Sequence, residues 1–566
     1  MTVLLAWMGF AGAAPGQGDW KALKTRANAL MPAAANQLEE RSGPNWAAFA
    51  LRSGLEAQTV ISCDAVGRLI LRSGAQRATT PTADEPPESC AAALIVVDAT
   101  NRRLLLKRDL LGRRALYWAR VPDGVIASTS LELLLVVERI PKRPNPHFLA
   151  AHFAGVAPED DATAYQEIRL VPGGTSVSVE RARHDVQVMQ VQPGTTSLTT
   201  RQAVEHAREL IDQAVLEACH GAKTLGFLLS GGFDSGCLLA RSQALRPELP
   251  KCAVTAGYTY PDVADERILA GTLATALEVR HLQMDAAGYV PDLCQLEDDW
   301  GPIANIFRTL NDASYARLRD AGESVLLTGQ YADQLDAGSG DWVREPTSWP
   351  DHWEVLLPAA IPWLLKRSGN RVARLLRPRV KRQADWLQPV WRDYLNELNA
   401  RRLHTYRDWP RPAQAAQVLG REISDCEILE HRHYLRHGLE ARHPFRSLPL
   451  VRFVLSQPAC RTRPPGQTKW IFREAMRGRM PEGVRTRKKC GTLLPLYELA
   501  LETSGADGYT IIERTFAAAD AYVQRDALNI NSLRALADTG DVRFIRLLSF
   551  ALWTRSCAAK AQLIQG

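Results

Sequence analysis

The stretch most able to do chemistry is a glycine-containing turn between an apolar run and a helical pattern. Residues 224–240 have the sequence TLGFLLSGGFDSGCLLA, which predicts a buried strand, a turn and then a helix. Ser230, Gly231 and Gly232 can bring backbone N–H groups close to a phosphate, and the helix N-terminus adds the positive end of its dipole. We therefore predict an anion site in this turn.

One carboxylate falls inside the predicted anion site. Asp234 would face the phosphates, which is favourable only with a cation between them, so we expect ATP with Mg²⁺. The GxxxxGK[ST] loop of other nucleotide-binding proteins is absent from the sequence, together with its phosphate-binding lysine. The alternative is an ordinary turn in which Asp or Ser caps the helix.

A second apolar run ends in a similar turn. Residues 324–334, SVLLTGQYADQ, place Asp333 just after Gly329. If both runs are strands of one parallel sheet, Asp234 and Asp333 lie at the same edge and could hold Mg²⁺ against pyrophosphate oxygens. The alternative for Asp333 is a turn-forming role.

Two later stretches carry many titratable side chains. Residues 430–437, EHRHYLRH, place two histidines on one helix face, but no further ligand completes a metal site, so we expect an ordinary helix. Lys469 and the run RTRKK over residues 485–489, which ends in Lys489, are cationic. Such a run is usually a solvated face or a patch that binds nucleic acid.

The composition is typical of a folded protein with several domains. The chain has 566 residues, of which 46% are hydrophobic and 23% charged. This length predicts about two to four domains. The net charge of +7 suits an anionic ligand such as ATP or an acidic peptide as well as it suits a nucleic acid, so charge alone does not choose between them.

Several features predict a cytoplasmic protein. The ten cysteines form no CxxC pair, which favours reduced thiols over a disulfide framework. The first residues, MTVLLAWMGF, lack the basic start of a signal peptide. No apolar run reaches 18 residues, so we expect no membrane span.

The pattern of elements predicts two domains, 1–195 and 196–566. The first alternates short apolar runs with turns, which is typical of an α+β layered domain. Strands are predicted at residues 3–8, 92–98, 103–107 and 175–179, and helices at residues 131–137 and 146–154. A Pro/Gly/Ser/Thr-rich stretch over residues 190–200 then precedes a predicted helix at 201–218. Beyond it strands alternate with helices, which predicts a doubly wound α/β sheet.

The motifs, in their order along the chain, identify a family. SGGFDS resembles the PP-loop of the ATP pyrophosphatases, which split ATP between the α and β phosphates. RDLLGRRALYW at residues 108–118 is similar to a segment of the glutaminase domain of asparagine synthetases, and PEGVRTRKKCG at 481–491 is similar to one in their synthetase domain. The chain is identified as a member of the asparagine synthetase family. The resemblance implies an Ntn-hydrolase-like αββα sandwich followed by an adenine nucleotide α-hydrolase-like (PP-loop) parallel sheet.

The resemblance also assigns roles to individual residues. It implies that Lys489 enters the active site and stabilises the charge of the transition state, together with Asp234 and Asp333, which hold the metal. The residues implied in nucleotide binding are Leu228, Ser230, Gly231, Gly232, Asp234, Ser235, Gly329, Lys469 and Lys489. The residues implied in substrate binding are Gln330, Tyr331, Glu440 and Arg442, of which the last two are expected chiefly to form an ion pair.

Three positions depart from the family pattern. Thr2 stands where the family has its glutaminase cysteine, so we expect a domain that has lost glutamine hydrolysis. Gln330 changes the residue that faces the substrate in relatives, which disfavours aspartate as substrate. Arg446 and Ser447 replace the Leu-Asp pair of the PFLD segment.

These departures favour an amide-forming cyclase that resembles the lasso-peptide macrolactam synthetases. Such an enzyme adenylates a side-chain carboxyl of a precursor peptide, and the N-terminal amine of the peptide then closes an isopeptide ring. A leader peptidase and a leader-recognition protein are the further partners implied, and no nucleic acid. The alternatives are β-lactam synthetase-like cyclisation of a small β-amino acid, asparagine-synthetase-like amidation, a PP-loop enzyme acting on tRNA, and a catalytically silent scaffold.

Overall fold

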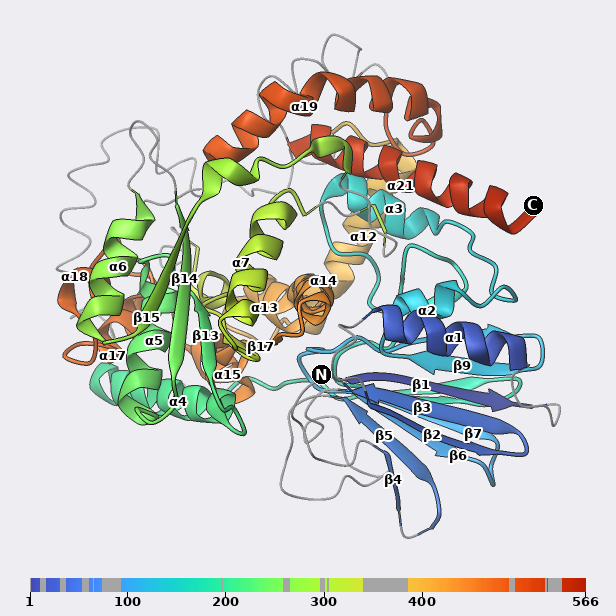
Figure 1. The fold of residues 1–566 in the computed structure, drawn as a ribbon, viewed down its shortest axis with the longest axis horizontal. Coiled ribbons are helices and arrows are strands. Elements are labelled where there is room, and N and C mark those ends of the chain that lie inside the picture. Colours follow the sequence, from blue (N-terminus) through green and yellow to red (C-terminus); the bar gives the residue numbers. More distant parts are fainter. Residues whose placement is uncertain are drawn as a thin grey trace.

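A computed structural model of the chain shows two sheet-containing parts with helices around them (Figure 1). It describes residues 2–10, 17–30, 37–52, 61–64, 66–73, 93–194, 197–257, 265–295, 301–302, 305–338, 385–487, 494–524, 527 and 542–565. The predicted domain junction at residue 195 lies outside these residues. None of the helices in the described residues is long and apolar enough to cross a membrane.

Two antiparallel sheets form the N-terminal part. The first has the strand order β10-β8-β9-β1-β3-β2, and the second has the order β12-β11-β7-β6-β5-β4. The first comprises β1 (Thr2–Gly9), β2 (Gln37–Gly43), β3 (Trp46–Arg52), β8 (Tyr117–Val121), β9 (Gly124–Ser128) and β10 (Ile168–Leu170). The second comprises β4 (Ile61–Cys63), β5 (Leu69–Ser73), β6 (Ala93–Asp98), β7 (Arg103–Arg108), β11 (Thr175–Val179) and β12 (His184–Val188).

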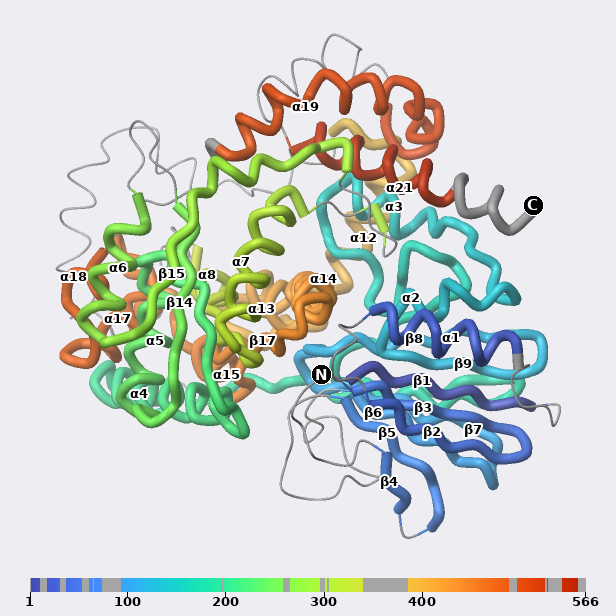
Figure 2. The backbone as a smooth tube through the Cα atoms, in the orientation of Figure 1, coloured from blue at the N-terminus to red at the C-terminus, as the bar shows by residue number. Residues whose placement is uncertain are grey.

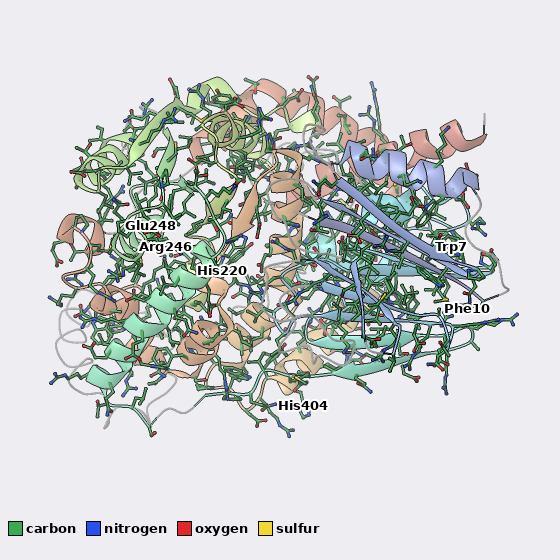
Figure 3. The ribbon with its side chains drawn as sticks, turned by 60° about the horizontal axis from the view of Figure 1, so that its bottom comes forward. Trp7, Phe10, His220, Arg246, Glu248 and His404 are labelled. Atoms are coloured by element: carbon green, nitrogen blue, oxygen red, sulfur yellow. The ribbon has the colours of Figure 1, made fainter. Side chains whose placement is uncertain are left out.

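The alternation of side chains along β1 explains how these layers stack. Leu4 and Met8 pack in the core between the two sheets, whereas Leu5 and Trp7 point to the opposite face and pack against helices. The covering helices are α1 (Gln17–Ala29), α2 (Leu131–Leu135) and α3 (Pro146–Ala154). Figure 3 labels Trp7 in this strand and Phe10 directly after its end. The described residues thus form a helical layer on two sheets, and no described helix packs on the outer face of the second sheet.

The C-terminal part is built on one parallel sheet of order β15-β14-β13-β16-β17. Its strands are β13 (Leu225–Leu228), β14 (Lys251–Gly257), β15 (Arg280–Asp285), β16 (Val325–Leu327) and β17 (Glu440–Arg442). The strand order reverses between β13 and β16, and ligands of such sheets bind at the carboxyl ends of the strands on either side of this point. The SGGFDS turn follows β13 and the GQYADQ turn follows β16.

Helices cover both faces of the parallel sheet, as the sequence predicts for a doubly wound fold. One face packs against α4 (Thr200–Cys219), α5 (Phe233–Leu245), α6 (Glu266–Ala276), α15 (Leu448–Ser456), α17 (Trp470–Ala475) and α18 (Glu482–Arg485). The other packs against α7 (Arg308–Asp320) and the C-terminal end of α14 (Arg421–Arg436). Thr199 caps α4 with a capping box to Gln202, close to the predicted start of this helix.

Helix α14 lies between the two parts (Figures 1 and 2). Its Ser424 hydroxyl donates to the carbonyl oxygen of Gly112 at 2.8 Å, and Arg421 donates to carbonyls of residues 159, 160 and 162. At its other end, Arg432 pairs with the buried Glu132. One side of α14 therefore carries much of the polar contact between the parts.

The described residues contain six further α-helices, two of which pack against α3 of the N-terminal part. They are α8 (Ala332–Leu335), α12 (Pro389–Thr405), α13 (Pro412–Leu419), α16 (Ala459–Thr462), α19 (Leu494–Thr515) and α21 (Val542–Gln565). Helices α19 and α21 pack against each other, and Arg546 of α21 donates to the carbonyl of Phe153 at the end of α3.

Candidate active site

The turn after β13 has a backbone that suits an anion. Gly231 adopts a φ of +62°, which favours glycine, and Gly232 precedes the first residue of α5. The N–H of Ser230 donates to the hydroxyl of Ser235 at 3.3 Å, which closes the turn over the helix start. Leu228, the last residue of β13, is half-buried beside it. The helix N-terminus and the turn thus lie together at the carboxyl end of β13.

The turn after β16 passes directly over the start of α5. A Cβ atom added to Gly329 would lie 2.7 Å from the backbone nitrogen of Ser235 and 2.9 Å from the carbonyl carbon of Asp234. These are backbone atoms that cannot give way easily, so only glycine fits between the two turns.

Gly329→Ala is therefore expected to force the two turns apart. The strain should lower the melting temperature by several degrees and weaken ATP binding, which calorimetry and thermal unfolding can measure. Gly322→Ala is not a suitable control because Gly322 has a φ of +92°. Gly483, whose added Cβ would meet nothing within 4 Å, is the matched position, and Gly483→Ala should leave both measurements close to those of the unaltered protein. Equal nucleotide binding by the two variants would contradict the expectation.

Lys469 brings the two predicted carboxylates together. Its ammonium donates a hydrogen bond to Asp234 and lies 2.7 Å from the Oδ1 atom of Asp333. Lys469 comes from the start of α17, so three separate segments of the chain meet at the carboxyl edge of the sheet. Its side chain is only 8% exposed, whereas that of Asp333 is 50% exposed. The cluster therefore has a buried side and a side that solvent reaches.

The charges in this cluster depend on one another. Burial raises the pKa of Asp234, Lys469 opposes the rise, and Asp333 adds to it. Burial lowers the pKa of Lys469, but the two carboxylates outweigh burial and the net shift is upward. Lys469 is accordingly a cation, and it neutralises part of the negative charge of the pair. A phosphate ligand placed here would meet one fixed positive charge.

Two residues with strained backbones lie in this site. Lys469 has a φ of +54° and Tyr331 a φ of +71°, both in the left-handed region that costs non-glycine residues free energy. Each residue stands immediately before a helix, α17 or α8. Strain of this kind persists only where the surroundings impose it, and it gathers at functional sites.

The oxygen atoms of the cluster fit a hard divalent cation. The Oδ1 atom of Asp234 is buried without a hydrogen-bond partner, and Asp333 offers a second carboxylate. One or two carboxylates plus phosphate oxygens are the usual ligand set of Mg²⁺. No group of three or more His, Cys, Asp or Glu suited to a metal occurs in the described part of the chain.

Gln330 and Tyr331 point from the same turn to a glutamate that sequence reasoning missed. The side-chain amide of Gln330 donates to Glu430 at 2.7 Å, and the hydroxyl of Tyr331 donates to its other oxygen at 2.9 Å. Tyr434 donates to Gln330 at 3.3 Å. Burial raises the pKa of Glu430 to about 7, Glu427 adds to the rise, and the bonds from Tyr331 and Gln330 oppose it. Glu430 therefore titrates near neutral pH beside the turn that carries Asp333.

Glu440 and Arg442 form the expected ion pair, with contacts of 3.0 and 3.3 Å. Arg442 also donates to the carbonyls of Ala218 and His220 at the C-terminal end of α4, where Figure 3 labels His220. The pair therefore fastens β17 to α4. A contact of this pair with substrate stays a prediction.

The predicted catalytic residue Lys489 lies outside the described residues. Arg487, near the end of the preceding segment, donates to the carbonyl of Gly231 at 2.7 Å. This bond brings the basic segment, as far as it is described, to the turn after β13.

A small cavity lies beside Thr2, where β1 faces α14. The space in it that the centre of a water molecule can reach is about 30 Å³, more than the roughly 10–15 Å³ that one buried water requires. The polar residues around it include Thr2, Arg114, Glu132, His431 and Arg432. Arg114 and His431 are 2.7 Å apart, and Arg432 pairs with Glu132, so the cavity wall is closed by bonds between the two parts.

Comparison with known proteins places this architecture in a family. Residues 206–554, more than half of the chain, match the family model "Asparagine synthase", and residues 90–189 match "Glutamine amidotransferase domain". The chain therefore belongs to the asparagine synthase family. This agrees with the resemblance inferred from the motifs.

Individual relatives are distant. Asparagine synthetase [glutamine-hydrolyzing] from Bos taurus is 30% identical over 160 residues, which cover 26% of each protein, so the chain spans about a quarter of this relative's length. The NH3-dependent NAD synthetase of Campylobacter jejuni covers 25% of this chain and 60% of its own at 14% identity and a TM-score of 0.18. The PRPP amidotransferase of B. subtilis covers 58% of this chain and 90% of its own at 8% identity and a TM-score of 0.22. Both TM-scores lie below the level at which a shared fold follows.

Proposed function

We propose that the protein is an ATP-dependent carbon–nitrogen ligase that joins a carboxyl group to an amine of the same peptide. The observation that carries the proposal is the convergence of Asp234, Asp333 and Lys469 at the point where the strand order of the parallel sheet reverses. Membership of the family supports the general class of reaction, and Thr2 and the Gln330–Tyr331 turn support the choice of substrates.

The first step would be adenylation. A substrate carboxylate oxygen attacks the α-phosphorus of ATP, a P–O bond forms, and the bond to the β-phosphate breaks with release of pyrophosphate. The turn after β13 would bind the phosphates, and Lys469 would stabilise charge on the oxygens in the transition state. Asp234 and Asp333 would hold Mg²⁺, which neutralises the pyrophosphate charge. Lys489 is proposed as a second cation at the same phosphates.

The second step would be attack by an amine. The amine nitrogen bonds to the acyl carbon, the bond to AMP breaks, and the amine proton passes to a base. Glu430 of α14 is proposed as this base because burial raises its pKa to about 7. It also accepts hydrogen bonds from Gln330 and Tyr331, which lie in the same turn as Asp333. Gln330 and Tyr331 would line the acyl group.

One feature supports a tethered amine over ammonia from glutamine. Thr2 stands at the position of the family's cysteine. An amine within the same peptide needs no ammonia supply, and holding it near the acyl carbon provides a high effective concentration. A macrolactam ring of the lasso-peptide type is the product we propose, made from a precursor peptide that a leader peptidase has already cut.

A mass experiment tests this function. The protein, Mg²⁺ and ATP are incubated with peptides that carry a free N-terminal amine and one internal Asp or Glu, with aspartate plus ammonium, and with an N-acylated β-amino acid. We expect a peptide to lose one water while AMP and pyrophosphate appear. Release of ADP and phosphate would contradict the mechanism, and turnover only with the β-amino acid or with aspartate would establish one of the two alternatives.

A further inference from the structure

Arg446 is a buried charge that departs from the family pattern. It stands where the resembling PFLD segment has leucine, and only 1% of its side chain is exposed. A leucine would need no polar partner here, whereas a guanidinium must satisfy its donors or destabilise the fold. The partners of Arg446 therefore indicate what the arginine does.

The three nitrogen atoms of this guanidinium contact three different segments. Nε donates to Glu427 of α14 at 3.0 Å, Nη1 donates to the carbonyl of Val418 at 2.7 Å, and Nη2 donates to the carbonyl of Leu111 at 2.9 Å. Glu427 is 2% exposed, so the ion pair is buried on both sides. Lysine cannot reproduce this arrangement, because its ammonium is a single point and not a planar fork.

The same guanidinium lies against the proposed amine-activating residues. Its central carbon lies 5.8 Å from the centre of the Tyr331 ring, within the range of a cation–π contact. Glu427 precedes Glu430 by three residues on α14, so their side chains are neighbours on the helix surface. Arg446 thus contacts the ring of Tyr331 and, through Glu427, the helix face that presents Glu430.

Leu111 extends this connection to the N-terminal part. It lies in the turn after β7, and the next residue, Gly112, accepts the bond from Ser424 of α14. Arg108, which is fully buried, donates to both Gly112 and Ser424. The turn is therefore fixed to α14 and to Arg446 at once.

We propose that Arg446 is a positioning residue for the amide-forming step, through which the N-terminal part holds Tyr331 and Glu430 in place. The inference rests on the proposed function, because it assigns the amine proton to Glu430. On this view the N-terminal part is retained without glutaminase activity because its turn after β7 completes the synthetase site.

The charged and titratable groups around Glu430 define what a test must separate. They are Cys426, Glu427 and Tyr434 on α14, Tyr331 before α8, Tyr315 on α7 and Arg446 beside α15. Burial raises the pKa of Glu427, and the ion pair with Arg446 opposes the rise. A change of Glu427 alone therefore alters the charge beside Glu430 in a known direction.

The first arm of the experiment separates the two half-reactions. Adenylation is followed by exchange of labelled pyrophosphate into ATP, and amide formation by the mass of the cyclised peptide. Arg446→Met is expected to leave exchange within about threefold and to slow amide formation about 10- to 100-fold, because a small displacement of reacting groups costs this much. Arg446→Lys should recover only part of the rate of amide formation that Arg446→Met loses. Arg421→Met is the matched control, since Arg421 is as buried and also donates to carbonyls of the N-terminal part.

The second arm needs no peptide substrate. Cys426 lies one turn before Glu430, and burial together with the Glu430 carboxylate raises the pKa of its thiol to about 12. Its alkylation, followed by peptide mass, should therefore rise roughly tenfold per pH unit, and the ionisation of Glu430 should appear as a step on that rise near pH 7. Glu427→Gln removes a negative charge and should move the inflection near pH 7 to lower pH, and Arg446→Met should also move it. Arg421→Met should not.

The outcomes are distinct. The proposal is overturned if Arg446→Met slows adenylation and amide formation by the same factor, and Arg421→Met does so too. It is also overturned if neither Glu427→Gln nor Arg446→Met moves the inflection near pH 7. Either result would leave Arg446 a structural ion pair. A protein that exchanges no pyrophosphate with any carboxylate offered would overturn the proposed function, and the Cys426 measurement would still decide whether Arg446 sets the state of Glu430.

Discussion

Replacement of Lys469 by methionine is expected to slow adenylate formation on the order of 10²- to 10³-fold, the usual loss when one fixed donor to a transition-state oxyanion is removed. Lys469 is the one described cation seen to contact both Asp234 and Asp333. Without it, the two carboxylates face each other with no charge between them. Exchange of labelled pyrophosphate into ATP measures the loss.

The same variant should gain affinity for a divalent cation in the absence of nucleotide. The lysine ammonium occupies the space between the two carboxylates, so its removal opens this space to Mn²⁺, whose binding titration calorimetry can detect. Lys251→Met is a matched control: counted over the whole residue both lysines are 7% exposed, but Lys251 donates to the carbonyls of Arg246 and Leu249 at the opposite edge of the sheet. Normal exchange by Lys469→Met, or equal losses in both variants, would contradict this role.

The sequence was sufficient to predict the parallel sheet and the two turns at its edge. Alternating apolar runs and helical patterns require a doubly wound arrangement, and such a sheet brings the ends of β13 and β16 together wherever the intervening chain goes. Asp234 and Asp333 are 99 residues apart along the chain, yet the topology alone makes them neighbours. Periodicity and turn composition carry that information.

The partners of these residues could not be predicted in the same way. The contact of Lys469 with both carboxylates could not be predicted because nothing in the sequence fixes where α17 packs, and its strained φ of +54° is imposed by tertiary contacts. Glu430 was missed because a glutamate in a histidine-rich helix is usually a solvated residue. Its burial depends on α14 lying between two parts of the molecule, which no local pattern shows. The one available signal was Arg446, a charge in an apolar position that requires a buried acid nearby.

Glu430→Gln is expected to abolish most amide formation while leaving adenylation nearly unchanged. Glutamine keeps the size of the side chain and an acceptor for the Tyr331 hydroxyl, but it cannot take a proton from an amine. General-base catalysis contributes roughly 10²- to 10⁴-fold, so the rate of ring closure should fall by about that factor. The acyl-adenylate should then accumulate, and hydroxylamine would trap it as a hydroxamate.

The pH dependence supplies an independent check on the same residue. A base acts only when ionised, and burial raises the pKa of Glu430 to about 7. Amide formation in the unaltered protein should therefore rise as the pH increases through about 7 and level off above it, whereas adenylation should show no such step. Glu422→Gln, the same substitution on the exposed side of α14, should keep both the rate and the profile. A flat profile, or a step that survives in Glu430→Gln, would assign the amine proton to another group.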